Sequence, residues 1–263
     1  MRYSRACCAH SELSSFRNAL AVYFLWVAAT YFLEGLPRTL LRPEASGLRL
    51  AYALIANLGI GILLCLWLIR RHLHAGWGAP ADYGFGSPGR RWASIAAAAA
   101  VGYGLFRLGH PRAVHDMVFL NAFAQVFVVS AAEVAVCWSL VGATLSVALA
   151  SWKRPAVLLA AGIVASLFFG LYHFAHSPPF NELGMVAFLT AIGIVTSVFW
   201  VASRDLVGTA VFHSFLGVTG VLAALEAGGK LTEWARPDPA LLIMALASAA
   251  ALAIGARPAA RAT

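Results

Sequence analysis

The stretch from Met117 to Ser151 constrains the fold more than any other part of the chain. It is almost wholly apolar and holds a single carboxylate, Glu133, near its middle. Roughly 20 apolar residues in a helix are enough to cross the hydrocarbon core of a bilayer, so the stretch predicts a membrane-spanning helix. An ionised side chain at that depth costs at least a few kcal/mol. We therefore interpret Glu133 as a functional residue.

The composition indicates a membrane protein throughout. Hydrophobic residues make up 61% of the 263 positions and charged residues only 11%, with a mean hydropathy of +0.78. Soluble domains carry about 25% charged residues. The net charge of +8 arises from short basic groups between apolar runs, which do not form the aromatic-interleaved patch of a nucleic-acid binder. We expect one integral-membrane domain over residues 1–263, in contact with lipid and with no nucleic-acid partner.

Eight apolar runs predict an all-α bundle of about eight transmembrane spans. The run at 117–151 exceeds the bilayer thickness by about 20 Å, which predicts an interfacial turn before the crossing. The expected spans are 19–33, 50–69, 92–106, a segment within 117–151, 156–172, 183–203, 206–225 and 241–256.

Basic residues predict which side of the membrane holds the termini. Eight spans place both termini on the same side, and loops on the cytoplasmic side carry an excess of Lys and Arg. With the termini inside, twelve basic residues are cytoplasmic and seven are not. The distribution therefore favours cytoplasmic termini. The twelve are Arg2, Arg5, Arg17, Arg70, Arg71, Arg90, Arg91, Lys153, Arg154, Arg204, Arg257 and Arg261.

Two histidines on later spans are candidate partners of Glu133. His173 follows Glu133 by 40 residues and His213 follows His173 by another 40, so the three lie on separate predicted helices within a core of about 117–225. A buried carboxylate beside imidazoles is suited to act as a general base toward water. We expect the carboxylate within about 4 to 8 Å of both rings, around a shared wet cavity. The alternative is that each group only hydrogen-bonds a neighbouring helix.

Three segments carry a resemblance to a known family. SAAEVAVCWSLVG, SLFFGLYHFAH and LVGTAVFHSFLG resemble the signatures of the CAAX protease and bacteriocin-processing (CPBP/Abi) family of glutamic-type intramembrane proteases. Phe169 and His173 match its Phe-x-x-x-His signature, and His213 matches its last histidine. The resemblance implies an endopeptidase of a bacterial inner (plasma) membrane. Its substrates would be prenylated C-termini, leader peptides or sorting tails of membrane-associated chains.

The first signature departs from the family pattern of Glu-Glu-x-x-x-Arg. Aligning Glu133 with the first, catalytic Glu puts Val134 at the second Glu and Trp138 at the Arg. The other register puts Ala132 at the catalytic position. We prefer the first register, because it keeps the carboxylate.

The third signature departs at its asparagine, which is Gly217 here. Loss of an oxyanion donor costs about 10² to 10³ in rate at comparable sites. Ser214, Thr219 or Tyr172 would have to supply a donor instead. Without one, the chain would be an inactive family member that acts as a membrane immunity or binding protein.

A metal site is the weaker interpretation of the same histidines. His173 and His176 are spaced i, i+3 and could bind zinc together with Glu133 and His213. His176, however, precedes two prolines at the edge of a span and is expected to be a solvated loop residue. We therefore expect no cofactor, and we expect Glu34, at the foot of the first span, to lie at the membrane interface, with gating or binding as the alternative.

Two further functions remain as alternatives. Cys137 lies one turn after Glu133 and could be the nucleophile of a sorting transpeptidase, but the arginine that such enzymes require between residues 154 and 204 is missing. A transporter or proton relay would also use buried Glu and His. We find no inverted repeat that would favour it.

Overall fold

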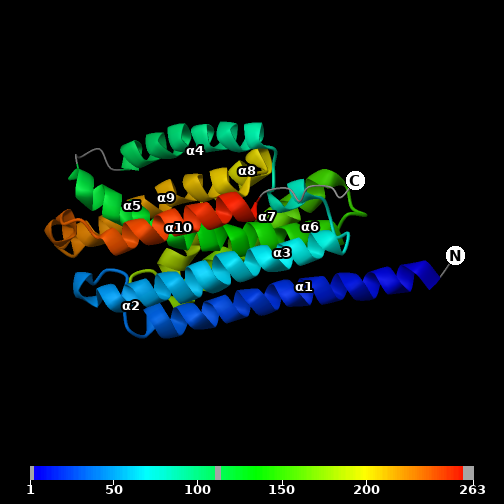
Figure 1. The fold of residues 1–263 in the computed structure, drawn as a ribbon, viewed down its shortest axis with the longest axis horizontal. Helices are drawn as coiled ribbons and strands as arrows, with labels where there is room; N and C mark the ends of the chain where they lie inside the picture. The colour runs from blue at the N-terminus through cyan, green and yellow to red at the C-terminus, as the bar shows by residue number, and fades with distance from the viewer. Residues whose placement is uncertain (1–2, 110–113, 257–263) are drawn as a thin grey trace.

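The structure, a computed structural model, describes residues 3–109 and 114–256, and within them all regular elements are helices. The long helices run side by side along one axis (Figure 1). All eight expected spans fall on helices, which confirms the predicted all-α bundle. The elements are α1 (Tyr3–Thr30) with η1 (Tyr31–Gly35), α2 (Ser46–Ala51) with η3 (Tyr52–Leu64) and α3 (Cys65–His74), α4 (Pro88–Gly109), α5 (Asp116–Glu133) with η5 (Val134–Gly142) and α6 (Ala143–Ala148), α7 (Arg154–Tyr172), α8 (Leu183–Ser203), α9 (Leu206–Ala227) and α10 (Pro239–Gly255).

Six of the described helices are long and apolar enough to cross a membrane. They are Ser14–Gly35, Ser46–His74, Asp116–Ala148, Arg154–Ala175, Leu183–Ser203 and Leu206–Ala227. The helix α10 is apolar but has 17 residues, and the alanine-rich α4 is not among the six. Large side chains such as Phe24, Leu159 and Leu246 are exposed on the outer surface. Exposed apolar surface of this extent is expected where helices face lipid rather than water.

The central rod of the bundle is longer than expected. Residues Asp116–Ala148 form one unbroken helical rod, with α-helical ends and the π-helical segment η5 between them, so the interfacial turn predicted within 117–151 is wrong. The rod contains no proline, and 94% of its most apolar window is buried inside the protein. Because neighbouring helices cover it, its length need not match the bilayer. Glu133 is the last residue of α5, directly before η5.

Arg91 joins three helices at one end of the bundle. Its guanidinium donates to the carbonyl oxygens of Ala253 (3.2 Å) and Ala256 (2.7 Å) at the end of α10. Its Nε lies 3.7 Å from Oδ2 of Asp205, which begins α9 by accepting the backbone N–H of Gly208 (2.7 Å). The start of α1 lies at this same end (Figure 1).

Loops interlock over the first turns of α5 at the opposite end. Gln125 donates to the carbonyl oxygen of Leu40 (3.0 Å), and Asn121 donates to that of Trp234 (2.9 Å). These bonds satisfy polar groups that would otherwise be buried without partners. They also fix the segment after η1 beside the rod that carries Glu133.

Candidate functional site

The structure brings Glu133, His173 and His213 together in the bundle interior. Oε2 of Glu133 lies 3.1 Å from Nε2 of His213, and Oε1 lies 3.7 Å from Nε2 of His173. All three side chains are buried. The expected gathering is therefore present, and the distances are shorter than the 4 to 8 Å that we expected.

His213 is oriented by Thr196 on the neighbouring helix α8. Its Nδ1 lies 2.7 Å from Oγ1 of Thr196, and that hydroxyl donates its one hydrogen to the carbonyl oxygen of Ile192 (3.1 Å). Nδ1 of His213 must therefore carry the hydrogen of the bond to Thr196. Nε2 then shares a proton with Glu133, either as an imidazolium beside a carboxylate or as a neutral ring beside a carboxylic acid.

His173 is held in one tautomer by the helix that carries it. Its Nδ1 lies 2.8 Å from the carbonyl oxygen of Phe169, which only accepts hydrogen bonds, so Nδ1 carries the hydrogen. In the neutral ring Nε2 is then a lone pair that faces Oε1 of Glu133. Two acceptors at 3.7 Å do not bind each other, so this gap suits a water molecule, a proton or a cation.

The Phe169 ring separates the two imidazoles. Its centroid lies 4.7 Å from that of His173 and 4.7 Å from that of His213, edge-on to both. The Trp138 ring packs 5.5 Å from Phe169 and from His213, and its Nε1 donates to Oγ of Ser197 (2.8 Å). The rings are therefore fixed by packing as well as by hydrogen bonds.

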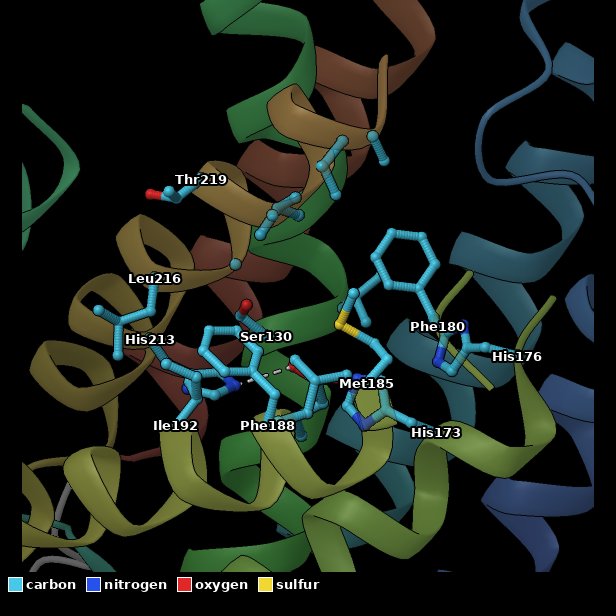
Figure 2. A pocket seen from close by; sticks show the side chains of 18 of the residues that line it. Ser130, His173, His176, Phe180, Met185, Phe188, Ile192, His213, Leu216 and Thr219 are labelled. Atoms are coloured by element: carbon cyan, nitrogen blue, oxygen red, sulfur yellow. Dashed lines mark hydrogen bonds and ion pairs between the residues drawn. The ribbon is translucent and has the colours of Figure 1, made fainter. Parts of the chain in front are cut away.

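A cavity of about 540 Å³ leads to these groups. Figure 2 shows His213, Ser130 and His173 on its wall, with Met185, Phe188 and Ile192 of α8 facing them. The lining is mostly apolar. The ionisable groups of the lining are Glu133 and the histidines, so a bound molecule would meet hydrocarbon along most of its length and ionisable groups at one place.

The cavity lies between the halves of α8 and α9 that are far from their connection. Its α8 wall uses the N-terminal half of that helix and its α9 wall the C-terminal half, with Val126 and Val129 of α5 behind. Phe188 on α8 is 59% exposed and Leu105 on α4 is 39% exposed. Because exposed side chains line it, the cavity reaches the outer surface of the bundle.

Two residues lie differently from our expectation. Glu34 and His176, expected at the interface and in solvent, are both buried. Ser177 donates both its backbone N–H (2.9 Å) and its hydroxyl (2.5 Å) to Glu34, and Nδ1 of His176 lies 3.1 Å from Oε2 of Glu34. The segment after α7 folds back into the bundle because Glu34 satisfies its polar groups.

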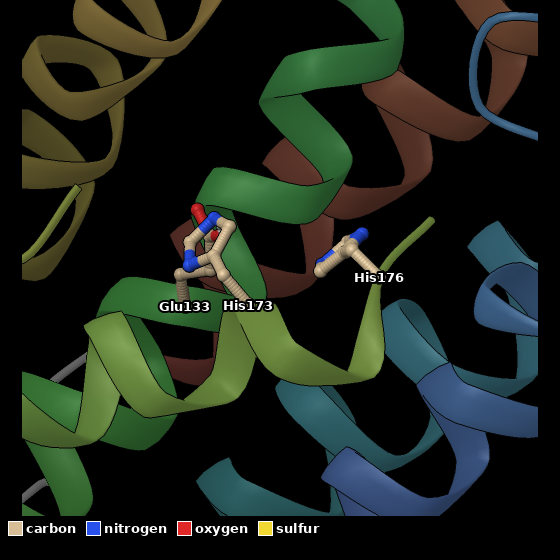
Figure 3. A group of neighbouring side chains, drawn as sticks. All are labelled: Glu133, His173 and His176. Carbon is tan, nitrogen blue, oxygen red and sulfur yellow. Dashed lines mark ion pairs between the residues drawn. The ribbon is translucent and has the colours of Figure 1, made fainter. Parts of the chain in front are cut away.

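His176 links its contact with Glu34 to the Glu133–His173 pair. Its ring stacks on that of His173 with centroids 5.2 Å apart, and it lines the same cavity. Ligand atoms of Glu133, His173 and His176 all lie within 4.8 Å of one another, the arrangement drawn in Figure 3. The sequence carried the signal as the i, i+3 histidine pair, but the neighbouring prolines suggested a solvated loop.

Only some of the residues considered for the oxyanion site line the cavity. Gly217 and Thr219 line the cavity, whereas Ser214 and Tyr172 are outside its lining. The Ser214 hydroxyl donates to the carbonyl oxygen of Ala210 (2.7 Å), and that of Tyr172 lies 2.9 Å from the hydroxyl of Tyr52. A Cβ at Gly217 would lie 2.8 Å from Cγ1 of Val126, so glycine permits the close approach of α9 to α5.

The other residues singled out in the first signature are buried in the packing. Val134, Cys137 and Trp138 are each at most 1% exposed, and Cys137 does not line the cavity. The thiol is therefore not positioned to attack a molecule held there.

Comparison with known proteins supplies no relative. No family model, no curated protein and no solved structure matches the chain. Observations that bear on function therefore come from the site itself.

Proposed function

We propose that the protein is an intramembrane endopeptidase, of the CPBP/Abi type that its sequence resembles, in which Glu133 and the two histidines activate water. One observation carries the proposal. The Glu133 carboxylate is held between Nε2 of His213 and Nε2 of His173 at a cavity that reaches the outer surface. A desolvated carboxylate next to imidazoles has the composition of a general acid–base site.

The geometry supports the following sequence of bond changes. A water in the gap between Glu133 and His173 attacks the scissile carbonyl carbon, and its proton passes to Glu133. The C–N bond then breaks, and the proton held between Glu133 and His213 goes to the leaving nitrogen. Thr196 and the Phe169 carbonyl keep the two rings in the required tautomers. Apart from the water that is consumed, no group outside the chain is needed to balance these steps.

The apolar cavity suggests the kind of substrate. An extended segment of a membrane-associated chain, such as a prenylated C-terminus, a leader peptide or a sorting tail, could enter from lipid between α8 and α9. Burial of its apolar side chains against Val129, Phe188 and Leu189 would contribute roughly 25 cal/mol per Å². The carbonyl to be cleaved would then lie where the polar groups gather.

The topology proposed for the chain fixes the side of entry. With the termini in the cytoplasm of a bacterial cell, as twelve of the 19 basic residues favour, the cavity occupies the half of the bundle away from the cytoplasm. Cleavage would then release fragments on the outer side of the inner membrane.

The test compares membrane-protein termini in cells that produce the wild type or Glu133→Gln. Quantitative mass spectrometry of new N-termini should find cleavage products with the wild type and none with Glu133→Gln. Glu182→Gln, the same change at an exposed loop carboxylate, is the matched control and should leave the products unchanged. Identical termini in all three strains would refute the protease and favour a binding or immunity protein that uses the cavity without chemistry.

A further inference from the structure

The two buried carboxylates of the site lack a fixed positive charge. Glu34 is 0% and Glu133 5% exposed, and among the described residues their ion-pair partners are all histidines. Although Glu133 shares a proton with His213, the histidines supply no fixed positive charge to these two carboxylates, and negative charge in an apolar interior is costly unless a cation balances it. A bound cation would provide that charge.

The histidine orientations favour a metal ion as that cation. Metal-binding histidines usually direct one ring nitrogen to the ion and the other to a carboxylate or backbone carbonyl. Nδ1 of His173 meets the Phe169 carbonyl, and Nδ1 of His176 faces the Glu34 carboxylate. In both rings Nε2 is thereby left for a ligand.

His176 supplies an independent observation. It is 4% exposed, its Nδ1 meets the Glu34 carboxylate, and its Nε2 has no hydrogen-bond partner among the described side chains. Buried polar atoms without partners are rare in native proteins and point to a missing water or ion. The ring is directed to the side of the cavity where Glu133 and His173 lie (Figure 3).

We propose that Glu133, His173 and His176 bind one divalent transition-metal ion of the zinc class, with Glu34 as the carboxylate that orients His176. Ligand atoms on a tetrahedral zinc ion are roughly 3.3 Å apart. The present separations reach 4.8 Å, so the side chains close by about 1.5 Å around the ion. Since all three ligands line the cavity, the fourth position faces it.

This site goes beyond the proposed hydrolysis, because ion binding is measured without a substrate. An ion with three protein ligands and an open position binds water and polarises carbonyl groups. Binding of the ion is therefore measured by retained Zn²⁺, and cleavage of a peptide is measured separately by its products.

The experiment measures Zn²⁺ retained by the full chain purified in detergent after removal of any histidine tag. Loading with Zn²⁺ and desalting should leave about one ion per chain by elemental analysis. Co²⁺ in its place should give the visible absorption bands of a tetrahedral site. The Co²⁺ spectrum needs no variant, so it tests the proposal even where a substitution impairs folding.

Variants locate the ion. His173→Gln and His176→Gln should each reduce retained Zn²⁺ to background, and Glu34→Gln should weaken binding by roughly 10- to 100-fold. His72→Gln is the matched control, since His72 is equally buried but packs beside Trp77 and Tyr83, outside the cavity. It should retain the ion. Size-exclusion profiles and unfolding temperatures establish that each variant is folded.

Two results would overturn the site. The wild type could retain no more Zn²⁺ than a His173→Gln/His176→Gln double variant, with no tetrahedral Co²⁺ spectrum. His72→Gln could also lose as much Zn²⁺ as the site variants do. If cleavage persists after the ion is removed, the proposed protease activity stands and the ion has no part in it. If the protein retains Zn²⁺ but cleaves nothing, the metal site stands and the proposed protease activity is rejected.

Discussion

Nδ1 of His213 lies 2.7 Å from Oγ1 of Thr196, and this hydroxyl joins α8 to the histidine that contacts Glu133. Valine at position 196 keeps the shape of threonine but leaves a buried N–H without an acceptor, at a cost of about 1–3 kcal/mol. We expect Thr196→Val to slow the proposed cleavage roughly ten- to hundredfold. Thr196→Ser should remain close to the wild type, and equal rates for the two variants would show that the hydroxyl does not orient His213.

Filling the cavity should block substrates without touching the ionisable groups. Ala224 lines the cavity on α9, and Ala227, three residues later, is exposed and outside it. Phenylalanine at position 224 should abolish the appearance of cleavage products, while Zn²⁺ retention stays at the wild-type level. Ala227→Phe is the control and should cleave normally. If Ala224→Phe cleaves as well as the control, substrates do not pass through this cavity.

The contact between α4 and α9 depends on a glycine. A Cβ at Gly208 would collide with Ser94, whereas a Cβ at Gly220 on the same helix meets nothing within 4 Å. Overpacking typically costs 1–3 kcal/mol. Gly208→Ala should therefore lower the unfolding temperature in detergent, and Gly220→Ala should leave it unchanged or raise it slightly. A fall of similar size in both variants would contradict the close packing of the two helices.

Asp205 gives a pH dependence whose sign follows from its burial. It lies between α8 and α9, outside the spans, and burial raises the pKa of its carboxyl above the ordinary value despite the nearby Arg91. A raised pKa in the folded state means that folding favours the protonated form. The contribution of Asp205 to the free energy of unfolding is complete below the pKa that this carboxyl has in the unfolded chain. It is lost as the pH rises through the pKa that the carboxyl has in the folded protein.

We therefore expect Asp205→Asn to gain stability relative to the wild type as the pH rises from acid to neutral, because asparagine also serves as an N-cap and does not ionise. Unfolding temperatures of both proteins across this pH range give the comparison. Asp205→Ala, which removes the cap, should be less stable than Asp205→Asn at every pH. A difference between wild type and Asp205→Asn that shrinks as the pH rises would reverse the sign and reject this account.

The helices were predictable because apolar length is a strong signal in a membrane protein. Each expected span falls on a helix, since long apolar runs between basic groups have few other stable structures in a bilayer. The failure at 117–151 has a physical reason. The run is longer than the bilayer is thick, but the rod is surrounded by protein, which removes that limit on its length.

The first three site residues were predictable for a related reason. Ionisable groups in spans are so costly that Glu133, His173 and His213 stood out from their sequence neighbours. Their meeting required only that three helices converge. Thr196 could not be selected this way, because a threonine in a span is common and its partner lies 17 residues later on another helix.

The burial of Glu34 and His176 was not predictable, because they lie at the ends of apolar runs, where sequence alone predicts exposure. Burial at these positions depends on the fold of the segment after α7, in which Ser177 donates two hydrogen bonds to Glu34. A contact across 143 positions leaves no local pattern in the sequence. The second carboxylate of the site thus becomes visible only in three dimensions.

The bond between Glu34 and Ser177 also sets an order of events during synthesis. Glu34, on η1, is synthesised long before α7, so this carboxylate has no contact with Ser177 or His176 until the later segment is made. The cluster closes only after α7 and the turn that follows it have been inserted. Until then the cluster of buried carboxylates and histidines is incomplete, and the late return of the chain to its first helix completes it.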